Sequence, residues 1–268
     1  MDLNTVRSVR VARSRADLVL SEGEAFLAGG TWLYSEPQPH VTGVVDLMTL
    51  GWPSLVTGPA GLEVAATCTL AELLALRPDP SWRAAPLFDQ CVNSLVASFK
   101  IFSAATVGGN LCTTLAAGSL IALTAALDGV ATIWSPHGGR RTVLVVDFVL
   151  GPQRNALLPG ELLRSVHLGA DALRSRTAYR KASLATLGRS GSLVIGRLGE
   201  DGAATFTVTA ATPRPYQLRY PRLPEAGQLR ADIAGIADWY DDPHGSPAWR
   251  AHITAVLAEE IRVELSEG

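Results

Sequence analysis

The sequence has no apolar run long enough to cross a membrane and no excess of basic residues. Its most apolar stretch, residues 120–127, falls well short of the roughly 20 residues that a membrane helix needs. Lysine and arginine together number 23 against 25 acidic residues, so the net charge is −2. Little counterion release could drive binding to a polyphosphate. The first residues also lack the basic-then-apolar order of a signal peptide. We therefore expect a cytoplasmic protein whose main partner is neither nucleic acid nor membrane.

The sequence also lacks the usual patterns of a metal centre or a nucleotide loop. Its cysteines, Cys68, Cys91 and Cys112, lie about twenty residues apart, which predicts free thiols and excludes a zinc or iron–sulfur knuckle within the chain. The five histidines show no ligand spacing, and neither a G-x-G-x-x-G nor a P-loop pattern occurs. Ser190 misses the nucleophile-elbow pattern by one residue. We predict no metal ligand and no catalytic side chain.

The composition and the residue patterns predict a compact protein with both helices and strands. The chain of 268 residues is 47% hydrophobic and 18% charged, enough for one large domain or two ordinary ones. Thr69 and Glu72 form a capping-box pattern, which predicts a helix start. Helices are expected over 70–76, 87–99, 229–240 and 247–265. Strands are expected over 41–47, 61–67, 129–134, 141–149, 161–168, 179–182, 192–198 and 204–209. The Pro-rich stretch 212–224 is expected to be extended, and a domain boundary is expected near residue 172.

Two short glycine loops carry the chemical signal. The first spans residues 26–33 (Phe-Leu-Ala-Gly-Gly-Thr-Trp-Leu), and the second spans residues 105–111 (Ala-Thr-Val-Gly-Gly-Asn-Leu). A diphosphate needs several backbone N–H groups at close range, and a Cβ would obstruct that approach. Neither loop contains Lys or Arg, so such a site would rely on backbone dipoles and neutral side chains. If one diphosphate is held by both loops, they must converge in space.

Singly, each loop is more simply read as a structural turn, but together they fit a known order of motifs. The two loops and the strand and capped helix between them resemble the FAD-binding subunits of molybdenum hydroxylases, the xanthine and carbon monoxide dehydrogenase type. Further segments agree in order, and the resemblance spans essentially the whole chain. These segments are Val45-Asp46-Leu47, Leu62-Glu63-Val64, Pro159-Gly160-Glu161-Leu162-Leu163, Tyr179-Arg180-Lys181 and Asp242-Pro243-His244-Gly245-Ser246-Pro247.

The resemblance implies a fold and a division of the chain. The fold class is α+β, with a two-subdomain FAD-binding domain of the vanillyl-alcohol oxidase/PCMH type over residues 1–172. Its subdomains would cover about 1–57 and 58–172. Residues 173–268 would form a C-terminal α+β domain like that of carbon monoxide dehydrogenase flavoproteins, with a three-stranded sheet plus helices.

The resemblance also implies cofactor-binding residues. Both loops would hold the FAD diphosphate, Leu163 would pack beside the flavin, and Lys181 would lie close to the flavin ring. The chain departs from the family pattern at several places. Trp32 stands where the family usually has a polar, often acidic residue; Phe102 and Ser103 replace Arg-Asn; and Ser119 replaces an acidic residue that hydrogen-bonds the cofactor. The implied set is Ala28, Gly29, Gly30, Thr31, Trp32, Leu33, Thr106, Gly108, Gly109, Asn110, Ser119, Leu163 and Lys181.

The implied function is electron transfer within a larger enzyme. Electrons from a molybdenum cofactor in a large molybdopterin-binding subunit would cross 2Fe-2S clusters in a small iron–sulfur subunit. They would then pass through FAD in this chain to an external acceptor, in a heterohexamer with two copies of each subunit. One alternative is a structural subunit with weakened or lost FAD binding. Another is a stand-alone flavin oxidase, which the chain length disfavours. The sequence leaves open the organic substrate and the acceptor.

Overall fold

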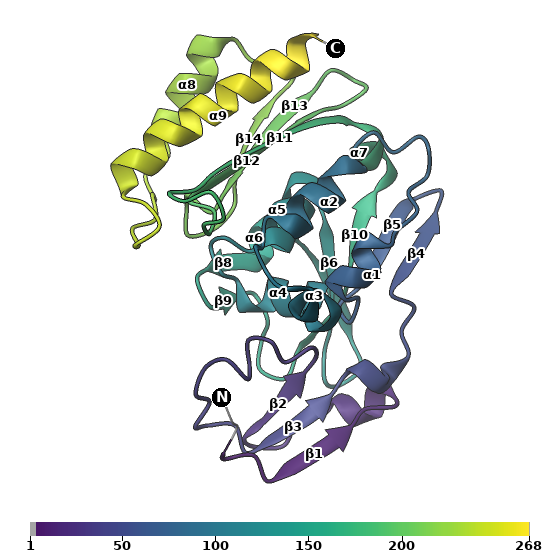
Figure 1. Cartoon of the computed structure of the whole chain (residues 1–268). Helices are drawn as coiled ribbons and strands as arrows, with labels where there is room; N and C mark the ends of the chain where they lie inside the picture. Colours follow the sequence, from purple (N-terminus) through teal and green to yellow (C-terminus); the bar gives the residue numbers. More distant parts are fainter. Residues whose placement is uncertain (1–3, 268) are drawn as a thin grey trace.

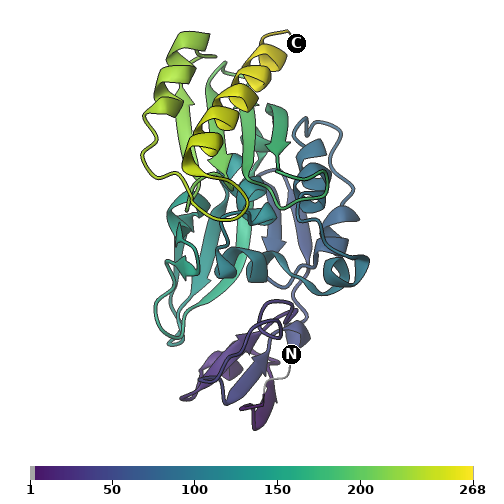
Figure 2. The same ribbon diagram turned by 60° about the vertical axis from the view of Figure 1, so that its left-hand side comes forward.

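The structure is a computed structural model that describes residues 4–267. Figure 1 shows the chain running from a small sheet at one end, through a helix-covered central sheet, to a third sheet under the two last helices. Figure 2 shows the first sheet as a lobe that projects from the rest. This arrangement confirms the α+β class, because mixed and antiparallel sheets are combined with helices that lie mainly outside β-α-β units.

The N-terminal lobe is a three-stranded parallel sheet in the order β1-β3-β2. Its strands are β1 (Ser8–Val11), β2 (Glu24–Leu27) and β3 (Gly43–Asp46), with short helical turns η1 (Arg15–Leu18) and η2 (Met48–Leu50). Val44 and Val45 of the central strand are buried, as in a parallel strand covered on both faces. Arg10 holds the outer strands together by donating two hydrogen bonds of 2.7 Å to the carboxylate of Glu24.

The central sheet is antiparallel and has the order β4-β5-β10-β6-β7. Its strands are β4 (Leu55–Gly58), β5 (Gly61–Ala65), β6 (Val130–Trp134), β7 (Arg140–Leu144) and β10 (Leu162–Gly169). β10 comes last in the chain yet lies in the middle, and its register shifts between Leu163 and Ser165. Such a shift is a bulge, which redirects side chains at a strand end.

Helices cover one face of this sheet and build the main core. They are α1 (Leu70–Leu74), α2 (Pro86–Asn93), α3 (Phe99–Ala104), α4 (Val107–Thr113), α5 (Ser119–Ala126) and the short α6 (Val145–Phe148). Every residue of α5 is buried, which fits its apolar sequence on all sides. A small ribbon of β8 (Val149–Gly151) and β9 (Arg154–Asn155) follows.

The C-terminal part is a four-stranded antiparallel sheet in the order β11-β12-β13-β14. After α7 (Ala170–Arg174) come β11 (Arg176–Ala182), β12 (Ser192–Leu198), β13 (Ala204–Thr209) and β14 (Tyr216–Tyr220), then α8 (Ala226–Ala234) and α9 (Pro247–Glu267). Helix α9 packs on β11 and β12, while α5 packs against β12 and β13. All six residues of β13 are therefore buried.

Most expected elements are confirmed, and four expectations are wrong. The helix expected over 229–240 runs instead from Ala226 to Ala234. The helix expected over 87–99 ends at Asn93, and a new helix starts at Phe99. The stretch 141–149 becomes a strand followed by the helical turn α6. The C-terminal sheet has four strands, because β14 forms within the Pro-rich stretch. In residues 4–267, no helix combines the length and apolar character that a membrane crossing requires.

Candidate functional site

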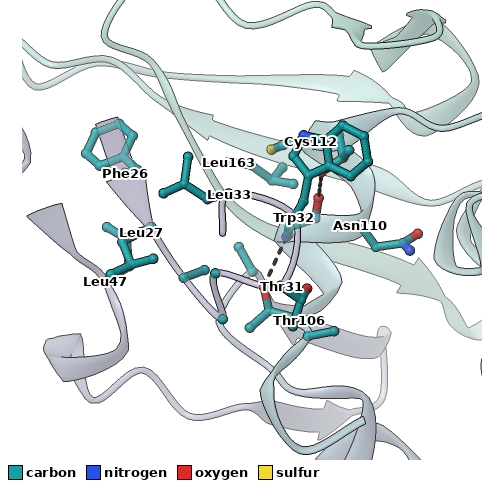
Figure 3. A pocket seen from close by; sticks show the side chains of 18 of the residues that line it. Phe26, Leu27, Thr31, Trp32, Leu33, Leu47, Thr106, Asn110, Cys112 and Leu163 are labelled. Atoms are coloured by element: carbon teal, nitrogen blue, oxygen red, sulfur yellow. Dashed lines mark hydrogen bonds between the residues drawn. The ribbon is translucent and has the colours of Figure 1, made fainter. Parts of the chain in front are cut away.

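A cavity of about 600 Å³ lies where the N-terminal lobe meets the central sheet and its helices. This volume is in the range of small-molecule and cofactor pockets. Three segments supply most of its lining: the end of β2 with the first glycine loop, the segment from Leu95 to Leu115, and the segment from Gln153 to Leu163. Leu47 and Ala66 complete it. Figure 3 shows these side chains converging from different elements. The two glycine loops therefore meet, as the sequence predicted.

The first loop approaches α3 so closely that only glycine fits. A Cβ on Gly29 would lie 1.7 Å from the carbonyl oxygen of Ala104. Gly30 has a φ of +69°, which favours glycine, and its carbonyl accepts a 2.9 Å hydrogen bond from the N–H of Tyr34. In the part of the chain that the structure describes, the backbone N–H groups of residues 29–33 have no hydrogen-bond acceptor. The same residues line the cavity, so their unused donors are close enough to serve an anion there.

The second loop leads into the first turn of α4, and most of its backbone N–H groups already donate hydrogen bonds within the chain. The N–H groups of Val107 and Gly108 donate to the carbonyls of Cys68 and Ala66, both at 2.8 Å. Thr106 caps the helix, because its Oγ1 accepts from the N–H of Gly109 at 3.0 Å (Figure 3). The N–H groups of residues 107–110 therefore have acceptors within the chain, through helix capping, the first turn of α4 and contact with the turn after β5.

The two glycines of the second loop have different roles. A Cβ on Gly108 would lie 2.6 Å from the Cβ of Ala66 and 2.7 Å from its carbonyl oxygen, so Gly108 is required by packing within the protein. A Cβ on Gly109 would meet a single atom within 4 Å, Oγ1 of Thr106 at 3.0 Å. Gly109 otherwise borders open cavity. The missing side chain at Gly109 leaves room for a ligand rather than for another part of the chain.

Asn110 also lines the cavity, but the oxygen of its side-chain amide has a structural role. Its Oδ1 accepts a 3.1 Å hydrogen bond from the N–H of Leu120 at the start of α5. The residue at the N-cap position of α5 is Gly118, which has no side chain to do so. The Nδ2 donor of Asn110 is left for a ligand.

The cavity is close to neutral. Glu161 carries the one formal charge among the described residues that line it. Arg141 donates to both of its oxygens, at 2.9 and 2.6 Å, and this holds the pKa of the Glu161 carboxyl below its ordinary value despite burial. Burial raises the pKa of the Cys112 thiol to about 12, so this cysteine stays a neutral thiol. Neutral donors and apolar contacts therefore dominate binding here.

The structure gathers eleven of the thirteen residues that the sequence singled out. Leu163 lines the cavity and is 1% exposed. Ser119 and Lys181 lie outside the lining set: Ser119 is fully buried at the start of α5, and Lys181 lies half-buried on β11 opposite Leu193. The eleven of these residues that line the cavity are Ala28, Gly29, Gly30, Thr31, Trp32, Leu33, Thr106, Gly108, Gly109, Asn110 and Leu163.

Sequence reasoning missed several lining residues. Glu161 belongs to the motif over residues 159–163, but the sequence did not show that it lines the cavity. There it forms an ion pair with Arg141. Gln153 lines the cavity from a turn in which its φ is +56°, and nothing in the sequence marked it. The replaced pair Phe102 and Ser103 lies on α3 and does not line the cavity; the Ser103 hydroxyl donates to the carbonyl of Phe99 at 3.0 Å.

Comparison with known proteins gives a family and a fold. Residues 10–170 match the family model described as the FAD binding domain in molybdopterin dehydrogenase. None of the curated protein sequences compared with the chain matches it. Among solved structures, the chain is similar to quinoline 2-oxidoreductase from Pseudomonas putida 86, with a TM-score of 0.80, 19% identity and 98% coverage of both chains.

Two carbon monoxide dehydrogenases have similar chains as well. Reconstituted CO dehydrogenase from Oligotropha carboxidovorans gives a TM-score of 0.81 at 21% identity, covering 98% of this chain and 99% of the other. Carbon monoxide dehydrogenase from Hydrogenophaga pseudoflava, lacking the Mo-pyranopterin moiety, gives 0.78 at 18% identity, with 96% of each chain covered. At such identities the likeness is one of fold.

Proposed function

Because the chain belongs to the family of FAD binding domains in molybdopterin dehydrogenases, we propose that it is an FAD-binding electron-transfer subunit of an oxidoreductase. It would receive electrons from iron–sulfur clusters in a partner and pass them to an external acceptor. The observation that carries the proposal is the cavity between the glycine loops, with free backbone donors on one side and the bare Cα of Gly109 on the other.

The residues present fit a dinucleotide held by neutral groups. The free N–H groups of residues 29–33 would hold the diphosphate, and the hydroxyl of Thr31 and the Nδ2 donor of Asn110 stand beside them on the lining. Thr106 and Gly108 would act through the backbone, by fixing the first turn of α4 against the strand end. FAD supplies the redox chemistry when bound, while the chain positions it and excludes water.

The partners and the domain boundaries belong to the same proposal. A small iron–sulfur subunit and a large molybdopterin-binding subunit would complete the enzyme, with two copies of each subunit in a heterohexamer. The match over residues 10–170 supports an FAD-binding domain that ends near residue 172. We further propose that this domain divides into two subdomains near residue 57. Residues 173–268 would then form the separate C-terminal domain.

The substitution Gly109→Ala tests the site with little risk to the fold. The new methyl group would enter the cavity, so we expect FAD retention after gel filtration to fall several-fold. Alanine favours a helix over glycine by about 0.5–1 kcal/mol, which should offset the 3.0 Å contact with Thr106. Gly227→Ala on α8, where a Cβ meets nothing within 4 Å, is the matched control and should keep the wild-type flavin content.

The visible spectrum of the purified chain separates this proposal from the alternative. A chain that keeps the flavin absorption, and loses it in Gly109→Ala but not in Gly227→Ala, supports FAD binding at this cavity. A wild-type chain that binds no FAD even when the cofactor is added would instead be a structural subunit. Equal FAD content in both variants would place FAD elsewhere.

A further inference from the structure

Trp32 is held in the cavity by a closed turn. The carbonyl of Gly30 accepts from the N–H of Tyr34, and the carbonyl of Trp32 accepts from both the N–H and the hydroxyl of Ser35, at 2.9 and 2.8 Å. These bonds fix the backbone on both sides of the tryptophan. Trp32 lines the cavity, and Figure 3 shows its indole extending from the loop toward Cys112 on α4. The fixed backbone therefore holds the indole ring in the cavity.

The indole has features of a ligand-contacting surface. It is half-buried, and its Nε1–H donates no hydrogen bond within residues 4–267, so that donor is open to a ligand or to water. The aromatic pairs found in the described chain, Trp52 with Trp134 and Phe206 with Tyr220, do not include Trp32 either. One face of its ring is thus available to another planar group.

The surroundings select an apolar planar group rather than the diphosphate. Around the indole, the cavity is lined by neutral side chains such as Leu33, Leu163 and Cys112. Leu163 is 1% exposed, so a ring placed beside it and Leu33 would be covered by apolar side chains. Burial of apolar area favours the larger, more apolar ring of a dinucleotide at such a place. In FAD that ring is the flavin, not the adenine.

We propose that Trp32 is the positioning residue against which the flavin ring of FAD packs in this chain, by aromatic contact in place of a polar one. The inference rests on the proposed function, because it requires FAD in this cavity. It further assigns Trp32 to the ring, whereas the free N–H groups of the same loop serve the diphosphate. Trp32 should then contribute to binding of FAD but not to binding of ADP, which shares only the other half of the molecule.

Emission from the bound flavin reports the contact directly. An electron-rich indole in van der Waals contact quenches an excited flavin, because an electron passes from indole to flavin and returns in the dark without net oxidation. We expect weak flavin fluorescence in the wild-type chain and a several-fold increase per bound FAD in Trp32→Phe. Trp239→Phe is the matched control, since Trp239 is a half-buried tryptophan that packs in the C-terminal core, away from the cavity lining.

Affinity gives a second readout that does not depend on fluorescence. Loss of an aromatic contact is worth about 0.5–1.5 kcal/mol, so Trp32→Leu should weaken FAD binding by about 2- to 13-fold and leave the Kd of ADP unchanged. Retained FAD with unchanged emission in Trp32→Phe would overturn the inference and leave the proposed function standing. So would an equal loss of ADP affinity in Trp32→Leu. A wild-type chain that takes up no FAD would overturn both together.

Discussion

Ser119 opens α5 with a fully buried side chain, and its Oγ has no hydrogen-bond partner within the described residues. The hydroxyl was removed from water without compensation, which costs roughly 1–3 kcal/mol. We expect Ser119→Ala to raise the free energy of unfolding by up to about 1 kcal/mol and to leave FAD retention unchanged. Denaturant unfolding of the two proteins measures the first effect, and flavin content after gel filtration measures the second.

Ser119→Asp provides the opposite test at the same position. A carboxylate at this fully buried position would lose its hydration, so it should lower stability by several kcal/mol. Tighter FAD retention in Ser119→Asp, without loss of stability, would show that this position does reach the cofactor. A less stable Ser119→Ala would show that the hydroxyl has a partner in solution.

The glycines show how far single residues can be interpreted from sequence. Paired glycines beside Thr and Asn were enough to predict that the loops converge. The sequence gives no means of separating Gly108, whose missing side chain makes room for Ala66, from Gly109, whose missing side chain opens the cavity. The difference depends on which atoms of another segment lie opposite, and only the tertiary structure supplies them. The role of Asn110 also depends on tertiary structure. Its Oδ1 accepts from the N–H of Leu120 at the start of α5, where the N-cap residue Gly118 has no side chain to do so.

At the scale of elements, the loop between β9 and β10 depends on one ion pair. Arg141 on β7 donates to Glu161 and to the carbonyl of Ala156 at 2.5 Å, and Glu161 also accepts from the N–H of Leu158 at 2.8 Å. The hydrogen bond from Arg141 is the main cause of the lowered pKa of Glu161. The pair thereby fixes a segment that forms one wall of the cavity.

This ion pair predicts a pH effect of definite sign. The pKa of Glu161 is lowered in the folded chain, so its contribution is complete above the unfolded value of about 4.3 and is lost as pH falls through the folded value. We expect FAD retention to be constant from neutral pH down to about 5 and to fall at lower pH. Glu161→Gln should retain less FAD already at neutral pH and should change less on acidification.

Protonation of other carboxylates with lowered pKa also destabilises the fold in acid. A matched variant is therefore needed to separate general unfolding from an effect of Glu161. Glu259→Gln removes a similar pair with Arg262 on α9, which lies outside the cavity lining. It should follow the wild-type retention curve. If Glu161→Gln and Glu259→Gln give the same curve, the loss in acid reflects general unfolding and the wall segment has no special part in it.

Several elements escaped sequence analysis, and for two of them the physical reason is clear. Helix α5 is buried on every side, so its mostly apolar sequence shows no 3.6-residue alternation. Strand β14 lies between prolines, which usually argue against a strand, but it is the edge strand of its sheet, where proline is tolerated nearby. By contrast, the helix start at Thr69 was predictable, because its capping box is local: the N–H of Thr69 donates to Glu72 at 2.7 Å.

At the scale of the whole molecule, the N-terminal lobe is joined to the central sheet by a small apolar cluster and a stack of arginine and tryptophan. The guanidinium of Arg15 lies 4.5 Å from the ring centre of Trp134, and that of Arg164, at the bulge of β10, lies 4.1 Å from Trp52. The two tryptophan rings meet edge to face at 5.5 Å. Since the first glycine loop belongs to the lobe, this junction sets the width of the cavity.

Trp134→Ala should therefore loosen the cavity from a distance. We expect a loss of about 2–3 kcal/mol in stability, less than for a fully buried tryptophan, together with a clear fall in FAD retention. Trp239→Ala truncates a similarly half-buried tryptophan in the C-terminal core and serves as the control. It should cost comparable stability with FAD retention intact. Proportional loss of FAD in both variants would mean that retention follows global stability alone.

The central position of β10 has a consequence for the nascent chain. β5 and β6 leave the ribosome first, and each exposes the edge that β10 will later fill, because the sheet order is β4-β5-β10-β6-β7. Unpaired edges of this kind invite wrong pairing between neighbouring chains. Leu162 and Leu163, which complete the cavity, arrive on the same late strand. Translation must therefore pass residue 169 before the cavity is complete, and until then the edges of β5 and β6 stay without their partner strand.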